Sequence, residues 1–548
     1  MAVLQVHPND NVLVALRDLA AGEMISWQGR TITIKHAIPA KHKIAIEVRK
    51  ADDAVIMYGV LVGRAVIPIA AGEAITTQNV KHAASEPQLR PSRYTWTPPD
   101  VSAFRSATFR GFHRADGKVG TANYWLVVPL VFCENRNIEV LREALVEKLG
   151  YGPPRPQLWN IDTLIENYQA GASQDTLLSL DLNNTKGGPP APRIFPNVDG
   201  IKFLTHAGGC GGTRQDSDAL CALLAGYINH PNVAGATVLS LGCQHAQVNI
   251  LKDAIHRLNP TFNKPLYVLG QQESRSEPEF IAQALRQTFV GLTEANRAVR
   301  TPAPLNKLVV GLECGGSDGF SGISANPTLG YFSDLLVARG GAAVLSEFPE
   351  LNGVEQDIVD RSASPAVAQK FLHLMQVYAE RARQAGSGFD MNPSPGNIKD
   401  GLITDAMKSA GAAKKGGTSP VVSVLDYTEQ VQGPGLHLLC TPGNDVESTT
   451  ALAGSGCNLI LFTTGLGTPT GNPIAPTIKV SSNTRLFQRM QDVIDFDTGD
   501  IIAGEATIEE KGHQLLTYVT AVASGEIIPH AVRLQQDDFI PWKRGVSL

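Results

Sequence analysis

The sequence predicts a multidomain α/β protein, with a small all-β domain at the N-terminus and two larger domains that each hold a mostly parallel sheet. Three observations predict this class. Residues 1–82 show short β-type runs, and residues 109–300 and 301–548 alternate apolar strands with amphipathic helices. The length of 548 residues also leaves room for about three or four domains.

The N-terminal runs have the length and composition of short strands. NVLVAL, TITIKHAI and KIAIEV are separated by AGE, GR and Pro turns, and no helical period is present. Residues 83–108 contain several prolines and no apolar period, which predicts a linker.

From residue 109 the pattern becomes strand, helix, strand. NYWLVVPLVFC, GIKFLTHAGGC and GATVLSLGC are strand-like, and VLREALVEKLG and SDALCALLAGYI have helical spacing. After a break at RTPAPLN, near residues 300–306, LVVGLEC, AAVLSEF, GLHLLC and NLILFTTG continue the alternation. Such βαβ units predict parallel sheets, whose ligands bind beyond the carboxyl ends of the strands.

Composition excludes two classes of protein. Lys and Arg number 47 against 52 Asp and Glu, charged residues make up 18% and hydrophobic residues 43%, so neither a basic nucleic-acid binder nor a disordered chain fits. The start of the chain lacks the basic and apolar pattern of a secretory leader, and no apolar run reaches the roughly 18 residues of a membrane span. We therefore expect a cytoplasmic protein with no membrane segment, whose seven cysteines are thiols.

Five cysteines occupy the same kind of position, at or just past the carboxyl end of a predicted strand. They are Cys133, Cys210, Cys243, Cys314 and Cys440. Four of them lie in polar or Gly-rich loops, FCENRN, HAGGCGGTRQD, LGCQHAQ and ECGGSDGFSG. A structural cysteine is usually a small buried hydrophobe, an interpretation that suits Cys221 and Cys457. The shared position at strand ends indicates that the five cysteines face a polar site.

The loop GLECGGSDGFSGISANP is the densest group of candidates. Cys314 and Asp318 offer a soft and a hard ligand, or a ligand and a base. A phosphate-binding loop is the alternative, but neither GxGxxG nor GxxxxGK[ST] is present there. In HAGGCGGTRQD, His206 lies four residues before Cys210 and is a catalytic or a structural imidazole.

Other loops after strands are rich in amide and hydroxyl groups suited to a polyol. They are NPSPGN, TPGNDVESTT and TTGLGTPTGNP, and SEFPELNGVE adds carboxylates that are either functional or a solvated helix start. Three lysines either contact an anionic substrate or are exposed to solvent. They are Lys408, Lys414 and Lys415. The substrate-binding candidates are Ser317, Asn326, Glu347, Asn392, Ser394, Asn397, Asp445, Thr463 and Thr464. In the β domain, His7, His42 and Tyr58 belong to a scaffold or to an active-site lid.

With these motifs the chain resembles the altronate dehydratase/galactarate dehydratase family along essentially its full length. The matching segments are VHPNDNVLVAL, IPAKHKIAI, VIMYGVLVG, RADGKVGTANYW, the GCGG and LGCQ loops, GLECGGSDGFSGISANP, SEFPE, NPSPGN, KGGTSPVVSVLDY, TPGNDVESTT and FTTGLGTPTGNPIAP. GLECGGSDG and GNDVESTT are closer to the altronate branch. The HAGGCGGTRQD loop departs from the family at Gly208 or Gly209, where altronate enzymes have a bulkier residue.

The resemblance implies a β-clip (SAF-type) domain, a linker, a dimerising middle domain and a C-terminal variant Rossmann-like domain. It implies dehydration of D-altronate to 2-dehydro-3-deoxy-D-gluconate with Fe(2+) or Mn(2+), by a homodimer that binds a sugar acid. From composition and run length we expect neither a nucleic-acid nor a membrane partner. A galactarate-type dehydratase or a sulfolactate-type sulfo-lyase is the alternative reaction. A sugar-acid-binding protein without turnover is the non-enzymatic alternative.

The chemistry needs a metal, a base and an acid. Thiolates suit iron, so we expect Cys133, Cys210, Cys243 and Cys314 to bind mononuclear Fe(2+) or an Fe–S cluster with one open iron. The competing hypothesis gives Asp318 and Glu347 a hard ion. His206 and His42 are the first acid/base candidates, followed by His7 and Tyr58, with Asp318 as the carboxylate candidate.

Overall fold

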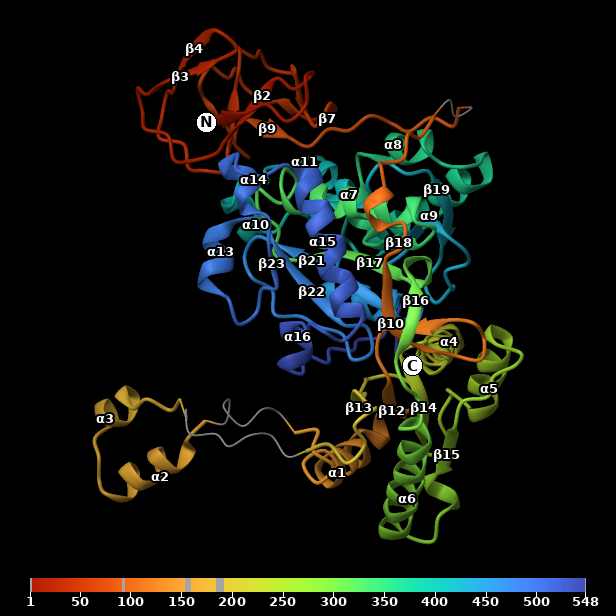
Figure 1. The fold of residues 1–548 in the computed structure, drawn as a ribbon. Helices are drawn as coiled ribbons and strands as arrows, with labels where there is room; N and C mark the ends of the chain where they lie inside the picture. The colour runs from red at the N-terminus through yellow and green to blue at the C-terminus, as the bar shows by residue number, and fades with distance from the viewer. Residues whose placement is uncertain (1, 91–93, 153–158, 184–191, 548) are drawn as a thin grey trace.

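The computed structural model describes residues 2–90, 94–152, 159–183 and 192–547 (Figure 1). Part of the predicted linker, residues 91–93, lies outside the described residues. The chain forms an N-terminal β domain, a middle domain with a four-stranded parallel sheet and a C-terminal domain with a seven-stranded parallel sheet. The multidomain α/β prediction is confirmed. No helix among the described residues is both long and apolar enough to cross a bilayer.

The N-terminal domain consists of short antiparallel strands because its apolar residues alternate over short runs between turns. Its sheets have the orders β1-β2-β5-β8 and β6-β7-β9, and β3 pairs with β4. Gly72 has φ +80°, and a Cβ there would lie 2.1 Å from the carbonyl oxygen of Thr33, so this turn requires glycine. The strands are β1 (Val3–Leu4), β2 (Val12–Ala15), β3 (Met24–Trp27), β4 (Arg30–Thr33), β5 (Lys43–Ala45), β6 (Ala54–Met57), β7 (Val60–Ala65), β8 (Ala74–Ile75) and β9 (Val80–Lys81).

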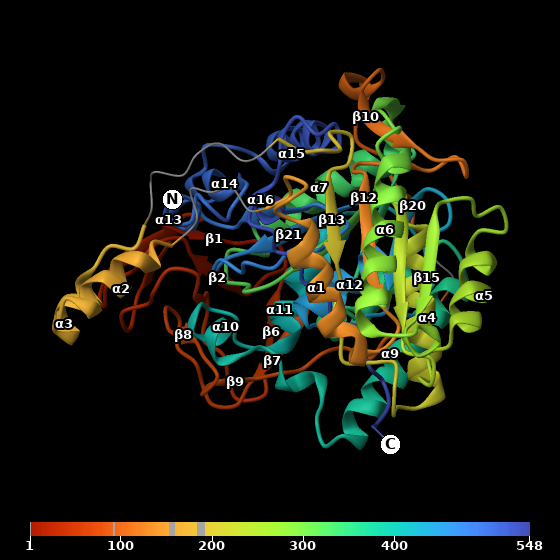
Figure 2. The same ribbon diagram turned by 90° about the horizontal axis from the view of Figure 1, so that it is seen from below.

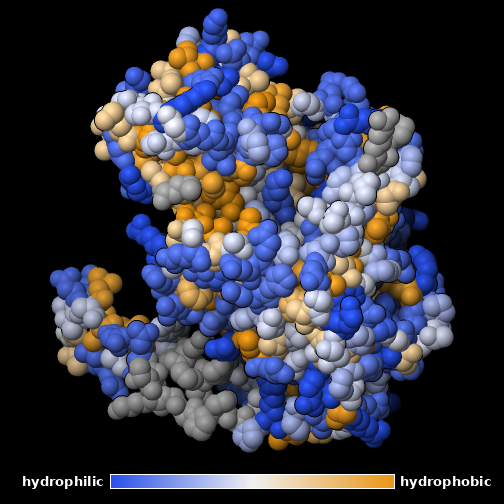
Figure 3. All heavy atoms as spheres, turned by 45° about the horizontal axis from the view of Figure 1, so that its top comes forward, coloured by the Kyte–Doolittle hydropathy of each residue, from blue (hydrophilic) through white to orange (hydrophobic). Residues whose placement is uncertain are grey.

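The N-terminal domain packs directly on the C-terminal domain. Val55, Met57 and Val62 belong to the same buried apolar cluster as Phe320 and Met407. On the face shown in Figure 3, apolar side chains border the hollow between the N-terminal domain and the rest of the molecule. The shared core fixes the β domain beside the loops of the seven-stranded sheet.

The linker runs along the surface of the C-terminal domain. The backbone N–H of Gln88 donates a hydrogen bond to Gln356 Oε1 at 2.7 Å, and the Trp96 indole donates to Thr418 Oγ1 at 3.1 Å. Strand β10 (Thr108–His113) then pairs with β16 (Thr301–Pro304) and with β11 (Val119–Gly120), antiparallel in both cases. The chain segments just before and just after the middle domain are therefore hydrogen-bonded to each other.

The middle domain has parallel strands in the order β13-β12-β14-β15. Trp125, on β12, is fully buried, and a Cβ at Gly291 would lie 2.0 Å from its ring, so helix α6 packs closely on the sheet. Helices α2 and α3 stand away from the domain in both ribbon views (Figures 1 and 2). The elements are β12 (Tyr124–Pro129), α1 (Asn135–Leu145), α2 (Ile161–Gln169), α3 (Gln174–Ser179), β13 (Gly200–Phe203), α4 (Arg214–Asn229), β14 (Val233–Ser240), α5 (Val248–Leu258), β15 (Leu266–Gly270) and α6 (Glu277–Ala295).

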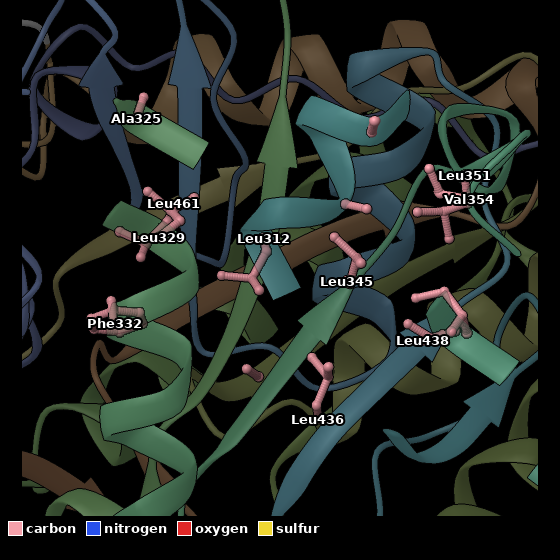
Figure 4. Packing of buried hydrophobic residues seen from close by; sticks show 14 of the residues in the cluster. Leu312, Ala325, Leu329, Phe332, Leu345, Leu351, Val354, Leu436, Leu438 and Leu461 are labelled. Atoms are coloured by element: carbon pink, nitrogen blue, oxygen red, sulfur yellow. The ribbon is translucent and has the colours of Figure 1, made fainter. Parts of the chain in front are cut away.

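The C-terminal sheet is parallel throughout, in the order β19-β20-β18-β17-β21-β22-β23. Leu312, Leu345 and Leu461, from three neighbouring strands, pack with helix α7 in Figure 4. The helices are α7 (Ala325–Ala338), α8 (Glu355–Asp360), α9 (Pro365–Gln384), α10 (Pro395–Lys399), α11 (Asp405–Ala412), α12 (Asp445–Gly454), α13 (Thr484–Arg489), α14 (Gly499–Ala503), α15 (Ile508–Ala523) and α16 (His530–Arg533). The strands are β17 (Val309–Cys314), β18 (Ala342–Leu345), β19 (Val421–Leu425), β20 (Gly435–Leu439), β21 (Leu459–Thr464), β22 (Thr477–Ser481) and β23 (Phe496–Asp497).

The strand order reverses at β17. From β17 the chain continues to β18 on one side, and β21 lies on the other side. In open parallel sheets the crevice at such a reversal, beyond the carboxyl ends of the strands, is where ligands bind. The loops that follow β17, β18, β20 and β21 are the place to look for a site.

Candidate active site at the carboxyl edge of the seven-stranded sheet

Three potential metal ligands meet just beyond β17 and β18. Cys314 ends β17, and Glu347 and Glu350 follow β18. One donor atom from each lies within 4.8 Å of the other two, and all three side chains are buried. The Cys314 thiol lies 3.0 Å from Glu350 Oε2, and its backbone N–H donates to Glu347 Oε2 at 3.1 Å.

Glu347 has a strained backbone. Its φ is +66°, a left-handed conformation that costs a non-glycine residue about 1–3 kcal/mol. The backbone N–H of Glu347 donates to Thr441 Oγ1 at 2.8 Å, and that of Phe348 donates to the Thr441 carbonyl at 3.1 Å. The loop after β20 thus holds the turn that points this carboxylate at Cys314.

Two lysines neutralise the acidic group. Lys415 Nζ lies 2.6 Å from Glu347 Oε2 and 2.8 Å from Cys314 Sγ. Lys408 Nζ, from helix α11, lies 2.6 Å from Glu350 Oε1 and donates to Asn392 Oδ1 at 3.0 Å. A buried carboxylate is tolerated when it is paired in this way.

Burial and these charges set the protonation states. Burial, with Glu347 and Glu350, raises the pKa of Cys314 well above its usual range, so without a metal the thiol keeps its proton. Burial alone would raise the pKa of Glu350, but Lys408 and Lys415 outweigh it and lower the pKa to about 2. The acids around Lys415 overcome its burial and raise its pKa, so it stays an ammonium.

Glu347 Oε1 and Glu313 Oε1 are among the buried carboxylate oxygens of the described residues that have no hydrogen-bond partner. The other oxygen of Glu313 accepts hydrogen bonds from Ser346 and Ser448 at 2.8 and 2.6 Å. An unsatisfied buried carboxylate oxygen is costly. Glu347 Oε1 belongs to a carboxylate that lies beside a thiol and a second carboxylate. These three side chains together are suited to bind a cation.

A further carboxylate, Asp445, lies near the buried group. It begins helix α12 and is only partly buried. Burial, with the charges of Glu347 and Glu350, raises its pKa to about 7. A Cβ on Gly315 would lie 2.1 Å from Asp445 Oδ2, so the glycine after Cys314 makes room for this carboxylate.

The N-terminal domain contributes two lysines to the same edge. Lys41 Nζ pairs with Asp318 at 3.0 Å and with Asp400 at 2.9 Å. Lys43 is fully buried, donates to the Gly401 carbonyl at 2.6 Å, and has a pKa lowered by burial to about 7. The contacts join the β domain to the loops after β17 and α10.

The predicted acid/base residues are spread over three places. Tyr58 has its hydroxyl 2.2 Å from the position of a Cβ on Gly322, inside the interface with the C-terminal domain. His42 lies 3.2 Å from the Ala40 carbonyl through Nδ1, and His7 Nδ1 accepts from the Asn9 N–H. His206 is buried in the middle domain, where its Nε2 lies 2.8 Å from the Pro129 carbonyl and its Nδ1 accepts from the Gly208 N–H.

Both His206 nitrogens are therefore bonded to backbone, so this imidazole holds the loop in the present arrangement. Asp318 is likewise occupied. Its oxygens accept from Lys41, from Ser482 Oγ at 2.8 Å and from Ser321 Oγ at 2.9 Å. This carboxylate holds the two domains together in the present arrangement.

Among the predicted substrate-binding residues, Glu347, Asn392 and Asp445 lie with the buried group. The others bond to the loops themselves. Asn326 bridges the Gly411 carbonyl and Thr463 Oγ1, and Thr464 Oγ1 accepts from the Gly467 N–H. Ser394 and Asn397 form the capping box of α10, and Asn397 also donates to the Ser317 carbonyl at 2.7 Å.

The four cysteines predicted to share a metal do not form one close donor group. Among the described residues, the only set of three close His, Cys, Asp or Glu donors is Cys314, Glu347 and Glu350. Cys133, Cys210 and Cys243 are exposed in the middle domain. Sequence reasoning also missed Lys41 and Asp400, which only long-range packing brings together.

Family models match nearly the whole chain. The D-galactarate/altronate dehydratase C-terminal model matches residues 305–547, the D-galactarate dehydratase/altronate hydrolase second-domain model matches 111–296, and the altronate/galactarate dehydratase SAF-domain model matches 1–83. These spans follow the three structural regions.

Individual relatives are similar over comparable lengths. An altronate dehydratase of Bacillus subtilis (strain 168) is 34% identical over 551 residues, 100% of this chain and 99% of the relative. An altronate dehydratase of Escherichia coli (strain K12) is 32% identical over 92% of each chain. A galactarate dehydratase (L-threo-forming) of Escherichia coli (strain K12) is 29% identical over 95% of this chain and 93% of the relative.

Proposed function

The chain belongs to the altronate/galactarate dehydratase family, and on that premise we propose that it removes water from D-altronate to give 2-dehydro-3-deoxy-D-gluconate. Family membership makes the protein a hydro-lyase of sugar acids. The observation that carries the proposal is the buried group of Cys314, Glu347 and Glu350 beside Lys408 and Lys415. It offers acids, cations and a metal-binding donor set at the crevice of the sheet.

The family resemblance implies divalent iron or manganese, and the donor set fits such an ion. Cys314, Glu347 and Glu350 would hold it, with the unpartnered Glu347 Oε1 as a free donor. A thiolate with carboxylates favours iron over the harder Mg²⁺. When bound, the ion supplies Lewis-acid stabilisation of the negative charge that develops on the substrate.

Asp445 is our candidate for the base. In the reaction the Cα–H bond breaks and its electron pair forms the Cα–Cβ double bond, while the Cβ–O bond breaks. The hydroxyl takes up a proton and departs as water, and the resulting enol tautomerises to the ketone. A carboxyl group with a pKa of about 7 can accept the first proton and supply the second near neutral pH.

The neighbouring cations favour an anionic substrate. Lys408 and Lys415 are ammoniums within the buried group, and they stabilise the charge of an enediolate formed there. The N-terminal domain, joined through Lys41 to Asp318 and Asp400, borders the loops of this edge. We expect it to exclude water from the reacting atoms.

The test is a substrate panel. The protein is incubated anaerobically with Fe(2+) or Mn(2+), a reductant, and D-altronate, galactarate or sulfolactate, and 2-keto-3-deoxy acids and sulfite are assayed. We expect product from D-altronate at the highest kcat/KM. Preferred turnover of galactarate or sulfolactate would reassign the substrate, and tight binding without any product would favour the sugar-acid-binding alternative.

A further inference from the structure

Three exposed thiols lie at the carboxyl edge of the middle-domain sheet. Cys133, Cys210 and Cys243 are exposed and unbridged, whereas the four remaining cysteines are buried. Cysteine is among the most frequently buried residue types. Three exposed thiols on three adjacent strands therefore call for a function.

The strand order brings the three cysteines together. Cys133 follows β12, Cys210 follows β13 and Cys243 follows β14, and β12 is the central strand that pairs with both of the others, in parallel. Parallel strands place their carboxyl ends at one edge. The three thiols consequently share this edge.

Backbone hydrogen bonds tie the three loops to one another. The Phe132 N–H donates to the Gly208 carbonyl at 3.1 Å, which joins the Cys133 and Cys210 loops. The Ala246 N–H donates to the Gly209 carbonyl at 3.1 Å, which joins the Cys210 and Cys243 loops. The loop that carries Cys210 is therefore fixed between the other two.

Glycine and histidine hold this arrangement. Gly209 has φ +95°, and a Cβ there would lie 2.1 Å from the Leu130 carbonyl oxygen, so the residue before Cys210 must be glycine. His206 fastens the same loop to the end of β12 through Pro129. On the other side, Gln272 Nε2 donates to Cys243 Sγ at 3.4 Å.

The three thiols do not form a close donor group. The three sulfurs are not all within 4.8 Å of one another, since this set is absent from the close donor groups of the described residues. A single tetrahedral ion with metal–sulfur bonds of about 2.3 Å draws its thiolates closer than that. A cluster of several irons separates them more widely and is held by Cys thiolates.

We propose that Cys133, Cys210 and Cys243 bind a 4Fe–4S cluster, each thiolate ligating one iron and the fourth iron having no cysteine ligand. The cluster belongs to the middle-domain sheet and is separate from the Cys314 group. The assignment does not depend on which sugar acid is dehydrated, and it is measured without turnover.

The test uses the full-length chain, expressed with an iron–sulfur assembly system and purified anaerobically. We expect about four acid-labile sulfides per chain and four or five irons, the fifth iron being the one held by the Cys314 group, with broad visible absorbance that dithionite bleaches. Cys133→Ser, Cys210→Ser and Cys243→Ser should each lose most of the sulfide and the absorbance. Cys314→Ala should keep both, because Cys314 lies in the other sheet.

Cys221→Ala is the matched control in the same domain, since Cys221 is buried in helix α4, and it should keep the full sulfide content. Circular dichroism checks that each Ser variant is folded. The substituted side chains are exposed, so at least two of the three are expected to fold. Zinc without sulfide, a disulfide between two of the three cysteines, or a wild-type sulfide content in all three Ser variants would overturn the assignment.

Discussion

The two parallel sheets of this chain both carry cysteines at their carboxyl edges, but the surroundings of these cysteines differ. Cys314 is buried with Glu347, Glu350 and Lys415, whereas Cys133 and its two neighbours in the middle domain are exposed. Burial raises the pKa of the Cys314 thiol, so this thiol depends on a metal to lose its proton. Cysteines at the same position relative to their strands therefore need not have the same chemical role.

The largest effect should come from breaking the buried group. Lys415→Met removes the ammonium that pairs with Glu347 and contacts Cys314, and it leaves a carboxylate buried without a counter-charge. We expect a loss of about 3–5 kcal/mol in the free energy of unfolding and no measurable turnover. Urea unfolding and product assays measure both.

Lys414→Met is the matched control, because Lys414 is the exposed neighbour of Lys415. It should change stability by no more than about 0.5 kcal/mol. If Lys415→Met matched Lys414→Met in both assays, the buried group would have no role in the fold or in the reaction.

The next effect concerns the base. Asp445→Asn should lower kcat by about 10²–10⁴-fold, because the amide cannot accept the α-proton. In the wild type, kcat should rise with pH through about 7 as Asp445 ionises, and the variant should lose this rise. An unchanged pH profile of kcat in Asp445→Asn would assign the base to another group.

The same pKa makes an opposite prediction for stability. The folded protein raises the pKa of Asp445 from 3.8 to about 7, so the native state holds a proton that the unfolded chain has lost. The stability from Asp445 is fully present below about pH 3.8 and is lost as the pH rises through about 7. Asp445→Asn should flatten the pH dependence of the unfolding free energy in this window.

A smaller effect is expected at the contact between the N-terminal and C-terminal domains. Lys41→Ala leaves the buried Asp318 without its ammonium partner, and we expect about 1–3 kcal/mol of destabilisation with reduced kcat/KM. Lys35→Ala, on the exposed surface of the same domain, is the control. Equal kcat/KM in both variants would indicate that the N-terminal domain serves only as a scaffold.

The smallest effect is a difference in thiol reactivity. In the metal-free native protein, iodoacetamide should label Cys133, Cys210 and Cys243, and it should label Cys314 only after unfolding, because the three are exposed and Cys314 is buried. Peptide mass spectrometry identifies the labelled positions. Labelling of Cys314 at the rate of the three would contradict the contrast between the two edges.

Local patterns in the sequence were enough to predict most of the fold. The apolar runs that end at Cys133, Cys314 and Cys440 contain strands β12, β17 and β20. Cys314 is the last residue of its strand, and Cys133 and Cys440 follow theirs. The pairing of β10 with β16 could not be predicted, because it joins segments at residues 108 and 304 that carry no pairing signal of their own.

The candidate site was only partly predictable. The strand-end position of Cys314 and the loop after β18 pointed to the edge where the buried donor group lies, since parallel strands bring their carboxyl ends together. Burial and partners depend on tertiary packing, so the difference in burial between Cys314 and Cys210 was not visible in the sequence. The contact of Lys41 with Asp318 depends on docking between two domains, which no local pattern records.

The central claim is that the buried edge of the seven-stranded sheet dehydrates the sugar acid. The most direct test compares Cys314→Ala with Cys440→Ala, a second buried thiol that follows strand β20 and lies outside the close donor group. Both variants are loaded with Fe(2+) and assayed for 2-dehydro-3-deoxy-D-gluconate formation from D-altronate. We predict that Cys314→Ala forms no product while Cys440→Ala stays active. Equal turnover by both variants would contradict the claim.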